Sequence, residues 1–477
     1  MTPVGGAADW LCESTDRQPE NPSTLSMKLL LEEAARRAAE YLATLPDRRV
    51  APDPAAVQRL AALDVPLQEE PRDPQRVLAE LDELVTPATM AMAGPRFFGF
   101  VIGGSLPAAL AANWLAGAWD QNAGIYSVTP GVAHLEQVVI RWLNDLFGLP
   151  PGTTGAFVTG ATMASFTSLA AARHAVLRRA DWNVEADGLF GAPPVTVIVG
   201  EEVHVTVLKA LGMLGLGRNR VVRVPSDAQG RMRAGELPHI EGPTIVCVQA
   251  GNVNSGSFDP LAQVCERAHE HGAWVHVDGA FGLWAKASPR YASLVEGMER
   301  ADSWSTDAHK WLNVPYDCGL ALVREPEPLA AAMAIQAAYI PAAEALRNPF
   351  DYTPEFSRRA RGVEVWAALR SLGRRGLAAM IERNCAAAQR FAQRLAAAGC
   401  EILNDVVLNQ VLVSFGETEC TQRVIAALQA DGTCWAGGTE WRGRTAMRIS
   451  VCNWATTDDD VDASVTAILR AKDRGTR

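Results

Sequence analysis

The sequence predicts an α/β protein with a mostly parallel sheet that is covered by helices on both faces. From about residue 155 to residue 323, short β-branched runs alternate with longer helical patterns, which is typical of repeated strand–helix–strand units. The 477-residue chain is 48 % hydrophobic and 21 % charged, as ordinary globular proteins are. This length leaves room for more than one domain.

Each element of the central part is predicted from its own pattern. Strands are expected at the β-branched runs Val195–Val199, Val221–Val224, Thr244–Val248, Trp274–Asp278 and Gly319–Val323. Helices are expected at Thr162–Arg179, Val205–Leu216 and Leu261–Gly272. Two runs, Phe97–Trp119 and Leu146–Ala172, contain no charge but several glycines and prolines. Because such residues break a membrane span, each run is expected to be a loop leading into a helix, and the first helix is expected to be buried.

The two ends of the chain differ from this central part. Residues 1–95 have helical periodicity around Met27–Ala43 and Pro74–Leu84, and they are expected to form an N-terminal helical arm. Residues 96–355 are then the large domain, and residues 356–477 are a smaller α+β domain. The elements expected in the smaller domain are helices at Arg361–Ala398, Thr421–Ala430 and Asp458–Asp473 and strands at Val411–Phe415 and Ala446–Val451.

Charge and cysteine content exclude several classes of protein. The net charge of −10 argues against a nucleic-acid partner, because phosphate neutralisation needs clustered lysine and arginine. The nine cysteines form no C-x-x-C pair, and their odd number is typical of thiols in a reducing compartment. The first thirty residues lack the basic and apolar regions of a secretory signal. We therefore expect a cytoplasmic protein without a membrane segment.

Residues that follow the strands are the candidates for chemistry, since ligands bind beyond the carboxyl ends of parallel strands. Asp278 ends an apolar strand, where a buried carboxylate needs a partner. That partner is either a local cap or salt bridge, or a protonated heterocyclic nitrogen. Lys310 lies close in sequence to Trp304 and Trp311, surroundings that favour a lowered pKa and Schiff-base chemistry. A lysine stem also passes apolar neighbours without any catalytic role.

Two further motifs each allow a functional and a structural interpretation. The segment Thr159-Gly-Ala-Thr-Met-Ala-Ser precedes an alanine-rich helix and is either an anion site at the helix N-terminus or a simple helix start. His204 is either a core histidine or a residue that stacks on a cofactor ring. His269 and His271 lie at a helix C-terminus, where the helix dipole favours histidine, so no metal site is expected.

Taken together and in their order along the chain, these motifs resemble those of pyridoxal-phosphate enzymes of the aspartate-aminotransferase fold. Among these enzymes, they resemble most the group II amino-acid decarboxylases. The most specific feature is the pair of motifs His-Val-Asp, ending at Asp278, and His-Lys-Trp, around Lys310. The resemblance extends from about Gly94 to the C-terminus and includes Gly94-Pro-Arg-Phe-Phe-Gly-Phe, Ser257-Phe-Asp-Pro and Ser357-Arg-Arg. It implies a seven-stranded sheet, pyridoxal 5'-phosphate as the cofactor, an amino-acid substrate and a homodimer.

The resemblance also implies roles for individual residues. Lys310 would form the internal aldimine, Asp278 would keep the pyridine nitrogen protonated, and His204 would stack on the ring. The other implied cofactor contacts are Ala161, Thr162, Asn252, Ala280, Asp307 and His309. Asp307 stands where relatives often have asparagine, which brings an extra negative charge to the phosphate unless His309 is protonated.

The expected reaction is decarboxylation of an L-α-amino acid to the amine and CO2, through an external aldimine and a quinonoid. A general acid must then return a proton to Cα. The loop Met333–Phe356 offers Tyr339 and Tyr352, of which Tyr352 is favoured. Arg448 either binds the substrate carboxylate or forms a structural ion pair. Phe100 either lines the substrate site or belongs to the core.

Other functions remain open from the sequence. A pyridoxal-phosphate aldehyde synthase, an aminotransferase or a carbon–carbon lyase would use the same residues. A scaffold or binding protein without catalytic activity is a further alternative, against which the presence of Lys310, Asp278 and His204 argues. An apolar or aromatic substrate side chain would suit the cluster Phe97, Phe98, Phe100, Trp114 and Trp119, although such a cluster is more often plain core.

Overall fold

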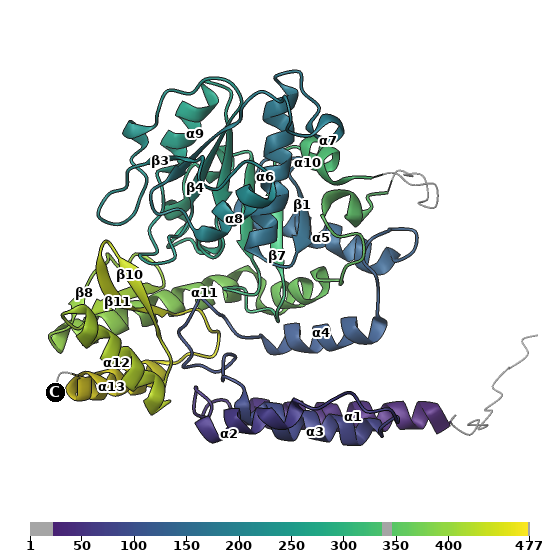
Figure 1. Ribbon diagram of the computed structural model, residues 1–477, viewed down its shortest axis with the longest axis vertical. Helices are drawn as coiled ribbons and strands as arrows, with labels where there is room; N and C mark the ends of the chain where they lie inside the picture. Colours follow the sequence, from purple (N-terminus) through teal and green to yellow (C-terminus); the bar gives the residue numbers. More distant parts are fainter. Residues whose placement is uncertain (1–21, 336–345, 476–477) are drawn as a thin grey trace, which may run out of the picture. The chain divides into compact units, whose positions relative to one another are not determined.

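The computed structural model describes residues 22–335 and 346–475, which fall into two units (Figure 1). The first unit contains the chain up to Arg48 together with Pro52–Thr89, and the second contains Arg49–Ala51 and the chain from Met90 onward. The first unit ends at Thr89, whereas the predicted arm extends to residue 95. A domain boundary at residue 355 stays a prediction.

The first unit is built from helices. Its elements are α1 (Pro22–Thr44), α2 (Pro54–Arg59), η1 (Leu60–Leu63), α3 (Pro74–Val85) and η2 (Thr86–Ala88). The helices α2 and α3 begin directly after Asp53 and Asp73, whose carboxylates accept backbone N–H groups of the first turn. Both helices also have proline at the first turn, where its missing N–H is tolerated. Arg37 of α1 and Asp82 of α3 form an ion pair at 2.7 Å.

The centre of the second unit is a seven-stranded sheet with the order β1-β7-β6-β5-β4-β2-β3. Its strands are β1 (Thr154–Val158), β2 (Thr196–Gly200), β3 (Val222–Val224), β4 (Thr244–Gln249), β5 (Trp274–Asp278), β6 (Ser303–Asp307) and β7 (Gly319–Val323). Strands β2 to β6 pair in parallel, whereas β7 is antiparallel to both β1 and β6. The predicted α/β class and mostly parallel sheet are confirmed. Strand β1 was not predicted, because its segment was interpreted as a loop and a helix.

Helices cover both faces of this sheet, and strand β4 shows the division. Ile245 and Cys247 pack in one core, together with residues of α6 (Ala161–Arg178), α8 (Val205–Met213) and α10 (Pro326–Met333). Val246 and Val248 point to the other core, together with residues of α5 (Pro130–Phe147) and α9 (Leu261–His269). This alternation is what a strand buried on both faces requires. The remaining short helices are α7 (Val184–Asp187), η3 (Ala234–Glu236), η4 (Gly282–Ala287), η5 (Ala292–Val295), η6 (Met298–Arg300) and η7 (Pro349–Tyr352).

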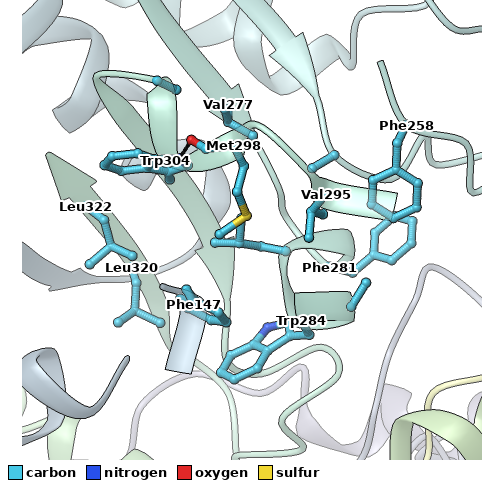
Figure 2. Close-up of a cluster of buried hydrophobic side chains, with 14 of the residues drawn as sticks. Phe147, Phe258, Val277, Phe281, Trp284, Val295, Met298, Trp304, Leu320 and Leu322 are labelled. Atoms are coloured by element: carbon cyan, nitrogen blue, oxygen red, sulfur yellow. Dashed lines mark hydrogen bonds between the residues drawn. The ribbon is translucent and has the colours of Figure 1, made fainter. Parts of the chain in front are cut away.

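The second of these cores contains large aromatic side chains (Figure 2). Trp284 and Trp304 are completely buried, Met298 lies between them, and Phe147 packs edge-on against Trp284 with ring centroids 5.1 Å apart. Each indole N–H donates a hydrogen bond to a backbone carbonyl: Trp304 to Met298 at 2.8 Å, and Trp284 to Asp307 at 3.0 Å. The bond from Trp284 fixes the backbone at the end of β6, where a predicted site residue lies.

The C-terminal part of the second unit carries a separate antiparallel sheet with the order β10-β11-β9-β8. Its elements are α11 (Gly362–Ala397), β8 (Glu401–Ile402), β9 (Gln410–Ser414), α12 (Thr418–Asp431), β10 (Gly437–Trp441), β11 (Arg444–Ser450) and α13 (Asp458–Gly475). A smaller α+β region is thus confirmed. The long helix predicted for 361–398 is two helices, because Gly373 has a φ of 58° and a ψ of 179° and interrupts α11.

Helix α4 (Pro107–Trp119) differs from its prediction. Ala109 is its only buried residue, whereas Trp114 and Leu115 are 45 % and 54 % exposed. The expected burial of this helix is therefore wrong for the single chain. A run without charges predicts that a helix lacks a polar face. It does not predict which part of the protein, if any, covers that helix. In the described ranges, no helix has both the length and the apolar character needed to cross a membrane.

Candidate active site

A cavity of about 200 Å³ lies at the carboxyl ends of the parallel strands. Most of the predicted site residues line it: Ala161, Thr162, His204, Asp278, Ala280, Asp307, His309 and Lys310. They come from the start of α6, from the residue before α8 and from the ends of β5 and β6. The sheet thus brings together residues that are far apart in the sequence, at the edge where parallel sheets bind ligands.

Lys310 follows β6, and its side chain is 20 % exposed. Its Nζ lies 2.9 Å from Oδ2 of Asp307, so the amine is held toward the cavity wall by an ion pair. The backbone of Gly103 lies against the carbonyl of Lys310, since a Cβ at residue 103 would be 1.8 Å from that oxygen. The glycine allows this close approach of the two segments.

Asp278 ends β5 and is 5 % exposed. Its Oδ1 accepts the backbone N–H of Ala280 at 3.2 Å. Burial raises the pKa of this carboxyl, although the charges of His204 and Lys310 act in the opposite direction. Within the described part of the chain, no basic group lies within 4 Å of it. The carboxylate therefore faces the cavity without an ion-pair partner.

His204 precedes α8 and is half-buried. Its Nδ1 lies 2.6 Å from Oγ1 of Thr206 and accepts the backbone N–H of the same residue at 3.4 Å. Burial lowers the pKa of the imidazole, with a smaller opposing effect from Asp278. These contacts require a neutral imidazole with an unprotonated Nδ1, because the N–H of Thr206 needs an acceptor.

The N-terminus of α6 also lines the cavity. Its N-cap residue, Gly160, has no side chain to cap the helix, and Oδ1 of Asp307 accepts the N–H of Ala161 at 2.6 Å instead. Gly319 of β7 passes so close that a Cβ there would lie 2.4 Å from Cα of Gly160. Such a helix start favours an anion through its unpaired N–H groups and its dipole.

His309 lies beside this helix start. Its Nδ1 accepts the backbone N–H of Cys318 at 3.1 Å, and its Nε2 lies 3.6 Å from Oδ1 of Asp307. Its ring packs on Tyr316, with centroids 4.4 Å apart. Burial lowers the pKa of His309. The ring is therefore neutral and carries its proton on the nitrogen that faces Asp307.

Asn252 lies in the loop after β4 and does not line the cavity. Its Oδ1 accepts the backbone N–H groups of Asn254 at 2.9 Å and Ser255 at 3.1 Å, which shapes the loop. The neighbours on either side, Gly251 and Val253, line the cavity instead. A direct contact of Asn252 with a cofactor stays a prediction.

Arg448 and Phe100 are the predicted substrate-binding residues, and neither lines the cavity. Arg448, on β11, donates to the carbonyl of Val253 at 3.3 Å, and burial lowers its pKa. No carboxylate lies within ion-pair distance of it in the described ranges. Phe100 is 61 % exposed, has a φ of 53° and stacks on Trp435 with centroids 5.4 Å apart.

Tyr352, the predicted proton donor, is not brought to the cavity within one chain. It lies at the end of η7, where the guanidinium of Arg347 covers its ring at 3.9 Å. Arg347 in turn lies 3.7 Å from Glu136. The other candidate, Tyr339, lies outside the described residues.

Several residues of the cavity were given no individual role from the sequence. Gly160 lies in the segment 159–165 that is predicted as a possible anion site, and Gln249, Gly251 and Val253 lie in the stretch Gln249–Ser255, which is a candidate because it follows a predicted strand. Thr206 and Phe281 are the other two such residues of the cavity. Thr206 lies two positions after His204, close enough to fix its ring. Phe281 offered no signal, because an apolar residue after a strand is most often core.

Comparison with known proteins connects this site to one family. The pyridoxal-dependent decarboxylase conserved domain matches residues 54–416. An aromatic-L-amino-acid decarboxylase of Bacillus atrophaeus is 28 % identical over 319 residues, which cover 64 % of this chain and 64 % of that protein. A phenylacetaldehyde synthase of Petunia hybrida is 26 % identical over 370 residues, which cover 72 % and 70 % of the two chains.

The fold is also similar to solved structures. The crystal structure of Oryza sativa TDC with PLP and tryptamine has a TM-score of 0.86 to this chain at 23 % identity, and the match covers 96 % of this chain and 99 % of that one. At this identity, the likeness establishes the fold alone.

Proposed function

The chain belongs to the family of pyridoxal-dependent decarboxylases, and we propose that it converts an L-α-amino acid to the corresponding amine and CO2. The observation that carries this proposal is the meeting of Asp278, Lys310 and the N-terminus of α6 in one cavity. When bound, pyridoxal phosphate supplies a protonated ring that accepts the electrons left on Cα after CO2 departs.

The residues of the cavity fit this cofactor. Lys310 offers an amine for the cofactor's carbonyl carbon, and Asp278 offers a buried carboxylate without an ion pair for the ring nitrogen. The backbone N–H groups at the start of α6, with the Thr162 hydroxyl and His309, suit a phosphate. The remaining contacts that we propose are Ala280 and His204 to the ring and Asp307 beside the phosphate.

In the proposed mechanism, Asp278 keeps the ring nitrogen protonated because a buried carboxylate without a partner gains most from a neighbouring cation. His204 restricts the position of the cofactor ring, because Thr206 fixes the imidazole of His204. Arg448 is proposed to bind the substrate carboxylate, and its lack of a carboxylate partner supports this role. Phe100 is proposed to contact the substrate side chain from the segment next to Gly103.

Whether Cα is protonated decides the product. Few groups in the cavity of one chain can donate this proton. Tyr352 remains the proposed acid, and it must reach the substrate from another copy of the chain or after a rearrangement around Arg347. The covered position of Tyr352 favours one second candidate function, an aldehyde synthase, whose products are aldehyde, ammonia and peroxide and which needs no acid from the protein to protonate Cα. Tyr352→Phe should increase aldehyde, ammonia and peroxide at the expense of amine.

We also propose that the enzyme is a cytoplasmic homodimer. The exposed Trp114, Leu115 and Trp119 of α4 form an apolar face that a second copy would cover. The cysteines of the described residues are all free thiols, which suits a reducing compartment. Sedimentation of the holoenzyme at two concentrations tests the dimer, and a monomer at both would contradict it.

The experiment that tests the function is incubation of the holoenzyme with each of the twenty amino acids. CO2, amine, ammonia and peroxide are measured together. Equal amounts of CO2 and amine from one substrate support the decarboxylase. Aldehyde and peroxide with little amine select the aldehyde synthase, and no CO2 from any amino acid contradicts both.

A further inference from the structure

Gln249 is the last residue of β4, and the proposed function gives it no role. It is 6 % exposed and lines the cavity. In the pairing of β4 with β5, Gln249 stands opposite Asp278. Paired residues of parallel strands direct their side chains to the same face of the sheet. Gln249 therefore lies beside the carboxylate that we propose for the ring nitrogen.

Asp259 holds the backbone of Gln249 in place. Its Oδ2 accepts the N–H of Gln249 at 2.7 Å, and its own N–H donates to the carbonyl of Gln249 at 3.0 Å. Its Oδ1 accepts the N–H of Met232, also at 2.7 Å. Asp259 belongs to the motif Ser257-Phe-Asp-Pro, which the proposed function does not use. The end of β4 is thus a fixed point from which the side chain of Gln249 extends.

The side chain of Gln249 reaches the segment that carries His204. Its Nε2 donates to the carbonyl of Glu202 at 2.8 Å. The other hydrogen bonds of residues 202–204 stay within the end of β2 and the start of α8. Among the described residues, the bond from Gln249 is therefore the only hydrogen bond that ties this segment to the strand pair β4 and β5.

The position of His204 depends on two separate contacts. Thr206 fixes the imidazole relative to its own segment, but it does not fix the segment relative to the sheet. The bond from Gln249 to the carbonyl of Glu202 makes that second connection. If the donor is lost, the segment can move and the imidazole moves with it. A displacement of about 1 Å is enough to lower the rate of a reaction at an active site strongly.

We propose that Gln249 is a positioning residue that sets the place of His204 relative to Asp278, through the carbonyl of Glu202. The inference rests on the proposed function, in which His204 contacts the cofactor ring and Asp278 its nitrogen. Gln249 itself needs no contact with the cofactor or the substrate for this role. The effect of replacing Gln249 must therefore depend on the presence of the imidazole of His204.

The first test is a double-mutant cycle on the affinity for pyridoxal phosphate, measured by equilibrium dialysis of the full-length protein. Gln249→Met keeps the length of the side chain but has no N–H to donate. We expect it to bind the cofactor about fivefold to tenfold more weakly than the wild type, whereas in His204→Ala the same change should cost less than about twofold. An equal loss in both backgrounds, or no loss in either, would overturn the proposal.

The second test uses Gln249→Asn and remains decisive if Gln249→Met does not fold. This variant keeps a polar amide, but its side chain is one methylene group shorter, so the amide does not reach the carbonyl of Glu202. Visible circular dichroism of the bound cofactor reports the asymmetry of its surroundings. We expect the signal of Gln249→Asn to differ from that of the wild type. A further change when Gln249→Asn is added to His204→Ala would contradict the proposal.

Gln429→Met is the matched control for a general loss of stability. Gln429, on α12, also donates through Nε2 to a backbone carbonyl, that of Ala436 at 2.9 Å, and it does not line the cavity. Gln429→Met should bind the cofactor as the wild type does. Equal weakening in Gln429→Met and Gln249→Met would show that only stability is affected, and would overturn the proposal.

The single variant His204→Ala separates this inference from the proposed function. If His204→Ala binds the cofactor as the wild type does and gives the same circular dichroism, the proposed contact of His204 with the ring is itself wrong. If His204→Ala weakens binding but the effect of Gln249→Met does not depend on it, only the role of Gln249 is wrong.

Discussion

Asp278 and Asp307 end neighbouring parallel strands, and both are buried, at 5 % and 2 % exposure, yet their surroundings differ. Asp307 has a backbone N–H and the ammonium of Lys310 as partners. Asp278 has one backbone N–H from Ala280, no ion pair among the described residues, and a pKa that burial raises. A buried carboxylate with its own partners is satisfied within the chain, whereas one without them needs a cation from a ligand. The comparison therefore distinguishes the side of the cavity that we propose for the cofactor ring from the side that we propose for its phosphate.

The largest expected effect comes from Lys310, whose charge acts on both aspartates. Lys310→Ala should lower turnover by more than about a thousandfold, because it removes the amine that we propose bonds to the cofactor. Activity and borohydride labelling are measured together, and the label should disappear. Lys209→Ala, at an exposed position of α8, is the control and should behave as the wild type. Turnover of Lys310→Ala within tenfold of the wild type would contradict the assignment.

The same substitution at each aspartate tests the comparison itself. Asp278→Asn should retain the cofactor and lose about a hundredfold or more in turnover, because a neutral amide no longer keeps the ring nitrogen protonated. Asp307→Asn should lose less than about tenfold when cofactor is saturating. Turnover is measured with the bound cofactor quantified by absorbance. Equal losses in the two variants would mean that the two sides of the cavity do not differ as described.

Arg448 extends the comparison to a cation. It has no carboxylate as an ion-pair partner among the described residues, just as Asp278 has no cation as a partner. Arg448→Lys should raise KM by about tenfold or more and change kcat less, since one ammonium cannot replace two parallel hydrogen bonds to a carboxylate. Arg444→Lys is the control on the same strand, where the arginine already pairs with Glu401. An unchanged KM in Arg448→Lys would leave Arg448 a structural role only.

The smallest effect is expected at a third buried aspartate, Asp259. Burial raises its pKa to about 6, although it accepts two backbone N–H groups. Because this folded-state pKa exceeds the unfolded value near about 3.9, its contribution to stability is fully present below about pH 4 and is lost as the pH rises through about 6. The free energy of unfolding of the wild type should therefore fall by about 1 kcal/mol between about pH 5 and about pH 7, relative to Asp259→Asn. Urea unfolding at both pH values measures this difference, and parallel changes in the two proteins would exclude it.

Features that depend on neighbours in the chain were predictable. Asp278 ends β5, Lys310 closely follows β6 and Ala161 begins α6, as the local patterns indicated. Strand periodicity and helix starts arise from a few consecutive residues, so a single sequence contains them. Because ligands bind at the carboxyl ends of parallel strands, these positions were enough to predict most of the cavity wall.

Other features depended on residues that are distant in the chain. Strand β1 exists because its five buried residues pair with β7, and its own composition did not reveal it. The side chain of Asn252 accepts a backbone N–H group of its own loop, while Gly251 and Val253 line the cavity. Tyr352 lies under Arg347 rather than at the cavity. No local pattern reports such contacts, because strand order and the packing of separate segments decide them.

The sequence by itself determined which residues stand at strand ends and at the start of α6. The tertiary structure alone decided that Asp307 reaches the N–H of Ala161, 146 positions earlier, and that Asp278 is left without an ion pair. The physical reason is that the charge state and partners of a buried carboxylate depend on the groups that folding places within a few ångströms of it, and these come from several strands and helices at once.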